Sequence, residues 1–219
     1  MKNYIVFFSF SLIIAGISYY IGTQHAQYRE ATYISHVLPQ RCSLKTNMRK
    51  LWSDHVWWTR DYLITAIADM PEAEAATTRL LKNQEDIGAA IAPYYGEEAG
   101  EKLTTLLKEH ILIAANVVTA AKENNNVKLK EEDEKWHANA DAIALFLSTA
   151  NQNWPLDTIK DMMYEHLKLT TEQVVARLKK DWSADIESFE KVFNEIMAMS
   201  DALAMGIIKQ FPEKFPEKF

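Results

Sequence analysis

The sequence predicts an all-α protein: an antiparallel helical bundle of about four to six helices, preceded by an N-terminal transmembrane helix. Three observations lead to this fold class. An uncharged apolar run opens the chain, and the segments after it repeat their apolar residues at helical spacing. No segment alternates as a strand would, and 219 residues contain only six Gly and six Pro. Long helices joined by short turns are what an antiparallel bundle requires.

The apolar run covers residues 4–22, YIVFFSFSLIIAGISYYIG. As a helix it would span about 28 Å, close to the thickness of a bilayer core. A cleaved signal peptide is the alternative, but no small-x-small cleavage site follows cleanly. We therefore expect residues 1–23 to form an anchor that contacts the membrane through residues 4–22. Lys2 on one side and Arg29 and Arg41 on the other do not set the orientation. We place the bundle on the extracytoplasmic side of a single-pass membrane protein.

Residues 24–46 lack periodicity and are predicted to be a juxtamembrane linker, followed by the bundle over residues 47–211. The first bundle helix is expected over Asn47–Met70 and ends before Pro71. Its apolar stripe is formed by Leu51, Trp52, Tyr62, Leu63, Ala66 and Ile67, and His55 falls inside that stripe.

Three further helices are predicted over residues 71–92, 97–122 and 128–150, separated by the turn signals Pro93-Tyr-Tyr-Gly96 and Asn124-Asn-Asn126. Each has an apolar stripe that includes polar side chains. Asn83 and Gln84 lie in the stripe of the first of these helices, and His110 lies in that of the second.

The C-terminal part predicts a short helix over residues 156–168 that carries His166. Thr170 with Gln173 has the pattern of a capping box and is predicted to start the last helix, which could reach Gln210. A helix of that length is long for a domain, so we expect a break near Trp182 to Asp185. Residues 212–219 are expected to be a frayed tail.

The composition limits the classes of function. The formal net charge is −6 and no basic cluster occurs, so a nucleic-acid partner is not expected. The single cysteine, Cys42, excludes an intramolecular disulfide. No phosphate-binding loop, nucleophile elbow or carboxylate pair can be identified, so no catalytic residue is predicted and enzymatic activity stays an open question.

Several polar residues lie on apolar stripes: His55, Gln84, His110, His166 and Asp185. Buried polar groups are costly unless they are hydrogen-bonded or bind something, and helical bundles place ligands on facing helices. We therefore predict a site between helices that binds a divalent metal ion or a small ligand, with His55, His110 and Asp86 as the metal ligands and Gln84 and Asn83 as the contacts of a small ligand.

The alternative is a structural or protein-interaction module in which these polar groups satisfy one another and no ligand binds. In that case exposed helix faces would contact a partner. Trp57 and Trp58 are adjacent on a helix, so one of them must face outwards.

Five short segments carry a resemblance: Leu51–Arg60 (LWSDHVWWTR), Asn83–Gly88 (NQEDIG), Pro93–Gly96 (PYYG), Leu107–Ile111 (LKEHI) and Asn151–Pro155 (NQNWP). Over about Leu51 to Phe215 the chain resembles a family of uncharacterised bacterial helical proteins. The resemblance implies a compact helical bundle and no established activity. Its polar matches are His55, Asn83, Gln84, Asp86 and His110, and the N-terminal apolar segment departs from the expected pattern.

Overall fold

The computed structural model describes residues 23–24 and 38–215. The predicted anchor, most of the predicted linker and residues 216–219 lie outside the described residues. Within the described part the protein has six main helices and no strand, which confirms the all-α bundle. The helices are α2 (Leu38–Ile67), α3 (Ala73–Tyr95), α4 (Glu97–Lys122), α5 (Asn126–Ala150), α6 (Leu156–Leu178) and α7 (Trp182–Gln210).

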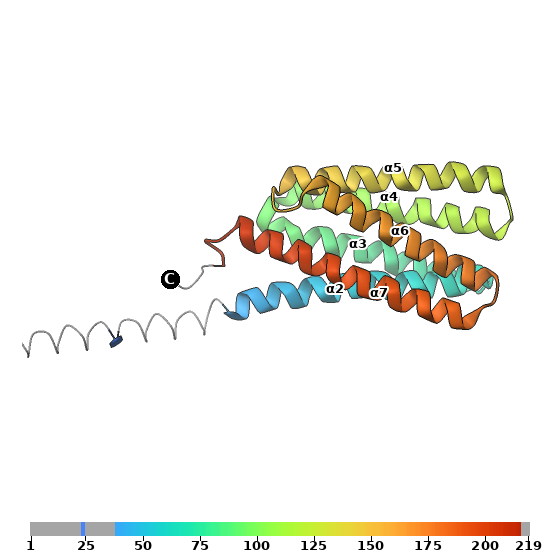
Figure 1. Ribbon diagram of the computed structural model, residues 1–219, viewed down its shortest axis with the longest axis horizontal. Coiled ribbons are helices and arrows are strands. Elements are labelled where there is room, and N and C mark those ends of the chain that lie inside the picture. The colour runs from blue at the N-terminus through green and yellow to red at the C-terminus, as the bar shows by residue number, and fades with distance from the viewer. Residues whose placement is uncertain (1–22, 25–37, 216–219) are drawn as a thin grey trace, which may run out of the picture. The chain divides into compact units, whose positions relative to one another are not determined.

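The chain divides into two compact units, residues 44–211 and residues 1–43 with 212–219. In the larger unit, consecutive helices from α3 to α7 lie side by side and run back and forth (Figure 1). Helix α2 packs against the inner side of this series, because Leu63 contacts Val118 of α4 and Val174 of α6. The face of α2 that carries His55 therefore lies at the centre of the bundle.

Helix α2 begins at Leu38 rather than near Asn47, so part of the predicted linker is helical. Pro39 does not prevent this, because proline is tolerated in the first turn of a helix. In the smaller unit, the guanidinium of Arg41 donates a 2.6 Å hydrogen bond to the carbonyl oxygen of Phe215, and the Phe215 side chain is buried. The prediction of a frayed tail is therefore wrong as far as Phe215.

The predicted helix start at Thr170 is also wrong. Thr170 lies inside α6, which continues to Leu178, and the side chain of Gln173 is buried instead of capping a helix. The chain breaks at residues 179–181, where Lys180 has a positive φ of 59° and the Asp181 carboxylate accepts a 3.0 Å hydrogen bond from the backbone N–H of Ala184. An aspartate N-cap thus separates α6 from α7, close to the expected break.

Helices α3 and α4 approach each other closely at Gly88. A Cβ atom at this position would lie 2.5 Å from the carbonyl oxygen of Gly100. The missing side chain therefore sets the separation of the two helices, and with it the position of Gln84, one turn earlier on α3.

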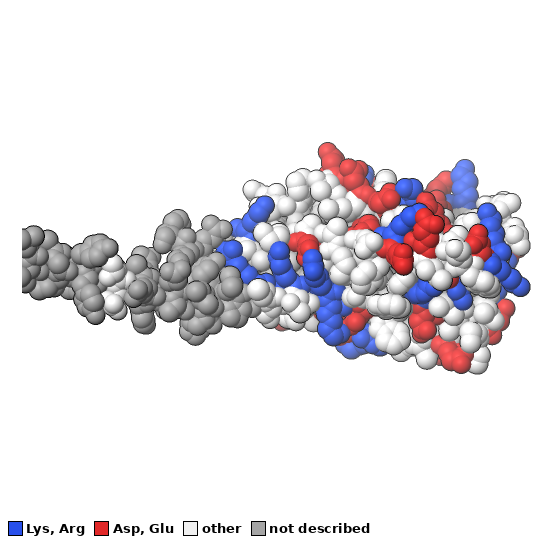
Figure 2. Space-filling view, turned by 60° about the horizontal axis from the view of Figure 1, so that its bottom comes forward, with Lys and Arg blue, Asp and Glu red and all other residues white. Residues whose placement is uncertain are grey.

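The larger unit carries acidic and basic side chains that are mixed on the face shown in Figure 2. Among the described helices, α4 alone has the length and apolar composition of a membrane span, and 44% of its most apolar window is buried. It packs between α3 and α5, as the core helix of a bundle would. This is therefore a weak indication of membrane insertion, and the predicted anchor over residues 4–22 stays a prediction.

Candidate functional site

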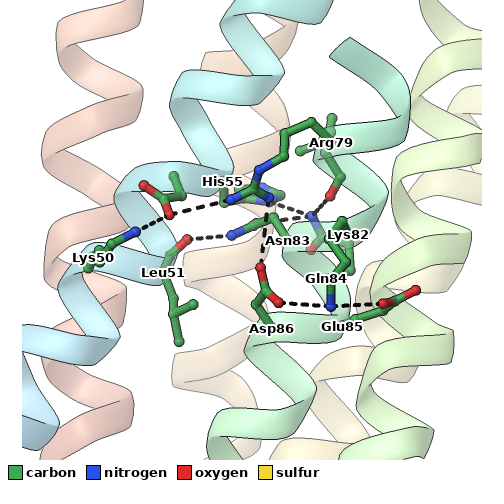
Figure 3. Close-up of polar contacts among 11 residues, drawn as sticks. Lys50, Leu51, His55, Arg79, Lys82, Asn83, Gln84, Glu85 and Asp86 are labelled. Carbon is green, nitrogen blue, oxygen red and sulfur yellow. Dashed lines mark hydrogen bonds and ion pairs between the residues drawn. The ribbon is translucent and has the colours of Figure 1, made fainter. Parts of the chain in front are cut away.

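His55 points into the core of the bundle, where its side chain is 4% exposed. Its Nδ1 atom lies 3.3 Å from the amide nitrogen of Gln84 (Figure 3). That amide nitrogen also contacts the carbonyl oxygen of Leu80 and the side-chain oxygen of Asn83, at 2.8 and 3.2 Å. The two hydrogens of the Gln84 amide are thus shared among three acceptors, on His55, Leu80 and Asn83. Burial lowers the pKa of His55 well below its ordinary value, and the nearby His166 and His110 lower this pKa further, so the imidazole is neutral.

His110 is held at both ring nitrogens. The indole N–H of Trp136 donates to Nε2 at 3.0 Å, and Nδ1 lies 2.7 Å from the Oδ1 atom of Asn139. An indole N–H is only a donor, so Nε2 accepts and Nδ1 carries the proton that is donated to Asn139. Burial lowers the pKa of His110 to about 3. This imidazole is therefore a neutral, fully paired core group.

Asp86 does not join these residues. Its carboxylate forms ion pairs with Lys82 at 3.1 Å and Arg79 at 3.8 Å, and its side chain is 34% exposed (Figure 3). Gln84 and Asp86 are two residues apart on one helix and so point about 200° apart. Asn83, which is buried, donates to the carbonyl oxygen of Leu51 at 3.0 Å.

The predicted metal ligands His55, His110 and Asp86 are therefore not brought together. Within residues 23–24 and 38–215, no group of three or more His, Cys, Asp or Glu side chains is placed to hold a metal ion. The structure does bring together His55 and the two predicted ligand contacts, Gln84 and Asn83. All three side chains are buried in the core.

The centre of the bundle contains a further polar pair. Nδ1 of His166, on α6, lies 3.0 Å from a carboxylate oxygen of Glu195, on α7. The rings of His166 and His55 have centroids 5.7 Å apart. The apolar stripe of its helix predicted His166 as a core residue. Glu195 was not predicted, because it lies at the edge of the apolar stripe of α7.

Asp185 forms a second buried ionic group. Its carboxylate accepts two hydrogen bonds from Arg60 of α2, at 3.2 and 3.0 Å, and one from Arg177 of α6, at 2.9 Å. These contacts tie α7 to α2 and α6. Asp185 was predicted to face the core, and its function in the fold is to neutralise two guanidinium groups.

An apolar cavity of about 90 Å³ lies between α2, α3, α4, α5 and α6. It was not predicted, because a cavity arises from the fit of side chains on different helices. The walls carry no charged side chain and consist of Thr59, Tyr62, Leu63, Leu80, Ile111, Ala114, Val117, Val118, Ala121, Leu129, Trp136, Thr170, Thr171, Val174 and Val175. Thr171 and Val175 are exposed, so the outer wall of the cavity reaches the surface of α6.

Comparison of the sequence with protein-family models, with curated proteins and with solved structures finds no match. The fold and the site define a class, an all-α helical bundle with a buried polar centre and an apolar cavity. The resemblance through short motifs therefore stays a prediction.

Proposed function

We propose that this protein is a membrane-tethered helical bundle that binds a small, mainly apolar molecule between its helices, in the cavity bounded by α2 to α6. The tether is the apolar segment of residues 4–22. The cavity is the observation that carries the binding proposal.

An empty apolar cavity is a cost to the fold. The side chains that line such a cavity lack part of the packing contacts that they would make in a filled core. Larger apolar cavities in proteins bind xenon and small hydrocarbons. A bound molecule would restore the lost contacts, which gives a reason for the bundle to retain the space.

The proposed site lies next to the predicted one. Leu80, one turn before Gln84 on α3, lines the cavity, and the backbone oxygen of His55 accepts the hydrogen bond of Thr59, which also lines it. The buried polar centre around His55 and Gln84 thus supports one wall of the cavity. No metal ion is part of the proposal, because the described His, Cys, Asp and Glu side chains do not form a ligand set.

A cavity-filling variant tests the proposal. Ala114 lies on the cavity wall, and Ala114→Leu adds three carbon atoms there. We expect the full-length wild type to show saturable shifts in its cavity methyl resonances under xenon pressure, and Ala114→Leu to lose them while it keeps or gains stability. Ala138→Leu, at an exposed position of α5, is the matched control and should leave xenon binding unchanged. Absence of saturable xenon shifts in the wild type would contradict the proposal.

A protein-interaction module is a second candidate function, favoured by an aromatic surface on α2 and α7. Trp57 is 54% exposed, and its ring lies 4.8 Å from that of Phe189. Trp182 and Ile186 are exposed on the same helix as Phe189. Exposed aromatic clusters are typical of binding surfaces. Sedimentation of the full-length protein and of its Trp57→Ser variant tests the simplest partner, a second copy: equal molecular masses at high concentration would exclude it.

A further inference from the structure

Three threonines line the cavity, and their hydroxyl groups are used differently. Thr59 donates to the carbonyl oxygen of His55 at 2.7 Å, and Thr171 donates to that of Leu167 at 2.9 Å. Thr170 is 6% exposed, and its hydroxyl has no hydrogen-bond partner among the residues that the structure describes.

This arrangement is unusual within the bundle itself. A helical threonine normally donates to the carbonyl oxygen four residues earlier. Eight other threonines of this protein do so: Thr59, Thr65, Thr77, Thr78, Thr105, Thr119, Thr149 and Thr171. For Thr170 that acceptor would be the carbonyl oxygen of His166, and the bond is not made. Thr104 bonds to the carbonyl oxygen of Gln84 instead, whereas Thr170 is buried and bonds to none of the described residues. Since buried hydroxyl groups are costly without a partner, this needs a reason.

The position of Thr170 on the cavity wall supplies one. Thr170 lines the cavity, and its buried hydroxyl can take any of three staggered rotamers because no hydrogen bond to a described residue fixes it. A molecule in the cavity that carries an oxygen acceptor would then receive this hydrogen bond. The cavity walls contain no charged side chain, so a charged ligand would lose its hydration without compensation.

We propose that the molecule bound in this cavity is a small neutral carbonyl compound, a ketone or aldehyde with an apolar remainder, whose oxygen accepts a hydrogen bond from Thr170. This inference rests on the proposed function and specifies the class of ligand. Thr170 is the residue that selects an oxygen-bearing molecule over a hydrocarbon of the same shape.

Acetone and isobutene are a matched pair of probes, because they have the same shape and differ in the acceptor oxygen. We would titrate both into the full-length protein and follow the methyl resonances of Val118 and Val174, with isobutene at defined gas pressure. Thr170→Val is nearly isosteric and replaces the hydroxyl by a methyl group. Thr171→Val is the control, since that hydroxyl is already bonded within its own helix.

The expected result is that Thr170→Val weakens acetone binding about three- to tenfold, the range of a neutral hydrogen bond, and leaves isobutene binding unchanged. Thr171→Val should change neither. Equal acetone affinity in the wild type and in Thr170→Val, or binding of isobutene without acetone, would overturn the carbonyl assignment and leave the cavity as a binding site. Failure of both probes to bind the wild type would instead reject the proposed function.

Discussion

The burial of His110 predicts that the bundle loses stability in mild acid. The folded protein resists protonation of this imidazole down to a pKa of about 3, whereas the unfolded chain takes up the proton near pH 6.5. The contribution to stability is therefore fully present above pH 6.5 and is lost as the pH falls below that value, by about 1.4 kcal/mol per pH unit. Between pH 7 and pH 5 His110 alone lowers the free energy of unfolding by about 2 kcal/mol. His55, whose pKa is also lowered by burial, acts in the same direction.

Urea unfolding of the full-length protein at several pH values between 5 and 7 measures this effect. His110→Gln replaces the imidazole by a group that keeps a donor and an acceptor but does not titrate, so its stability should fall less steeply with decreasing pH. His137→Gln is the control, because His137 is a half-exposed histidine of α5. NMR of the His110 ring gives an independent reading and should show no titration above pH 4. Equal pH slopes for the wild type and His110→Gln, or a ring that titrates near pH 6, would refute the account of the buried imidazole.

The remaining predictions concern stability, measured by urea unfolding. Asp185→Asn leaves Arg60 and Arg177 without their counter-charge and should cost about 3 kcal/mol; a loss below 1 kcal/mol would mean that the ionic group is not buried as described. Asp86→Asn breaks only exposed ion pairs and should change the free energy of unfolding by less than about 0.5 kcal/mol. A large loss would contradict the conclusion that Asp86 lies outside the buried polar group. Gly88→Ala forces α3 away from α4 and should cost about 1–3 kcal/mol, whereas a neutral result would show that the helices have room to separate.

The number and type of the elements followed from the sequence, because helical periodicity is a local property. Two predicted boundaries were wrong, the start of the tail and the start of the last helix, because contacts between distant residues decide them. Phe215 is ordered by Arg41, which lies near the other end of the described chain. Thr170 and Gln173 have the sequence pattern of a capping box, but both side chains are buried inside α6, and Asp181 caps the start of α7 instead.

The candidate site was predicted only in part. Periodicity correctly placed His55, Gln84, His110 and His166 in the core, because orientation on a helix is set by spacing. It did not reveal which polar groups pair. The partner of His110 is Asn139, one helix further along the chain, and no local pattern relates the two.

Two of the five motifs that carry the family resemblance meet in space. Tyr95 of the Pro93–Gly96 motif accepts a 2.8 Å hydrogen bond at its hydroxyl from the side chain of Asn151, in the Asn151–Pro155 motif. The same hydroxyl donates to Gln210 at 2.9 Å. Burial raises the pKa of Tyr95 to about 12, so this hydroxyl stays protonated. These two motifs therefore connect the end of α3 to the loop before α6 and to the end of α7, which is a structural role.

The most direct test of ligand binding between the helices is a crystal structure of the full-length protein determined under xenon pressure. We predict one ordered xenon atom in contact with Val117, Val118 and Val174, with the surrounding side chains unmoved. A structure in which these side chains close on one another and xenon occupies no position among them would contradict the proposal.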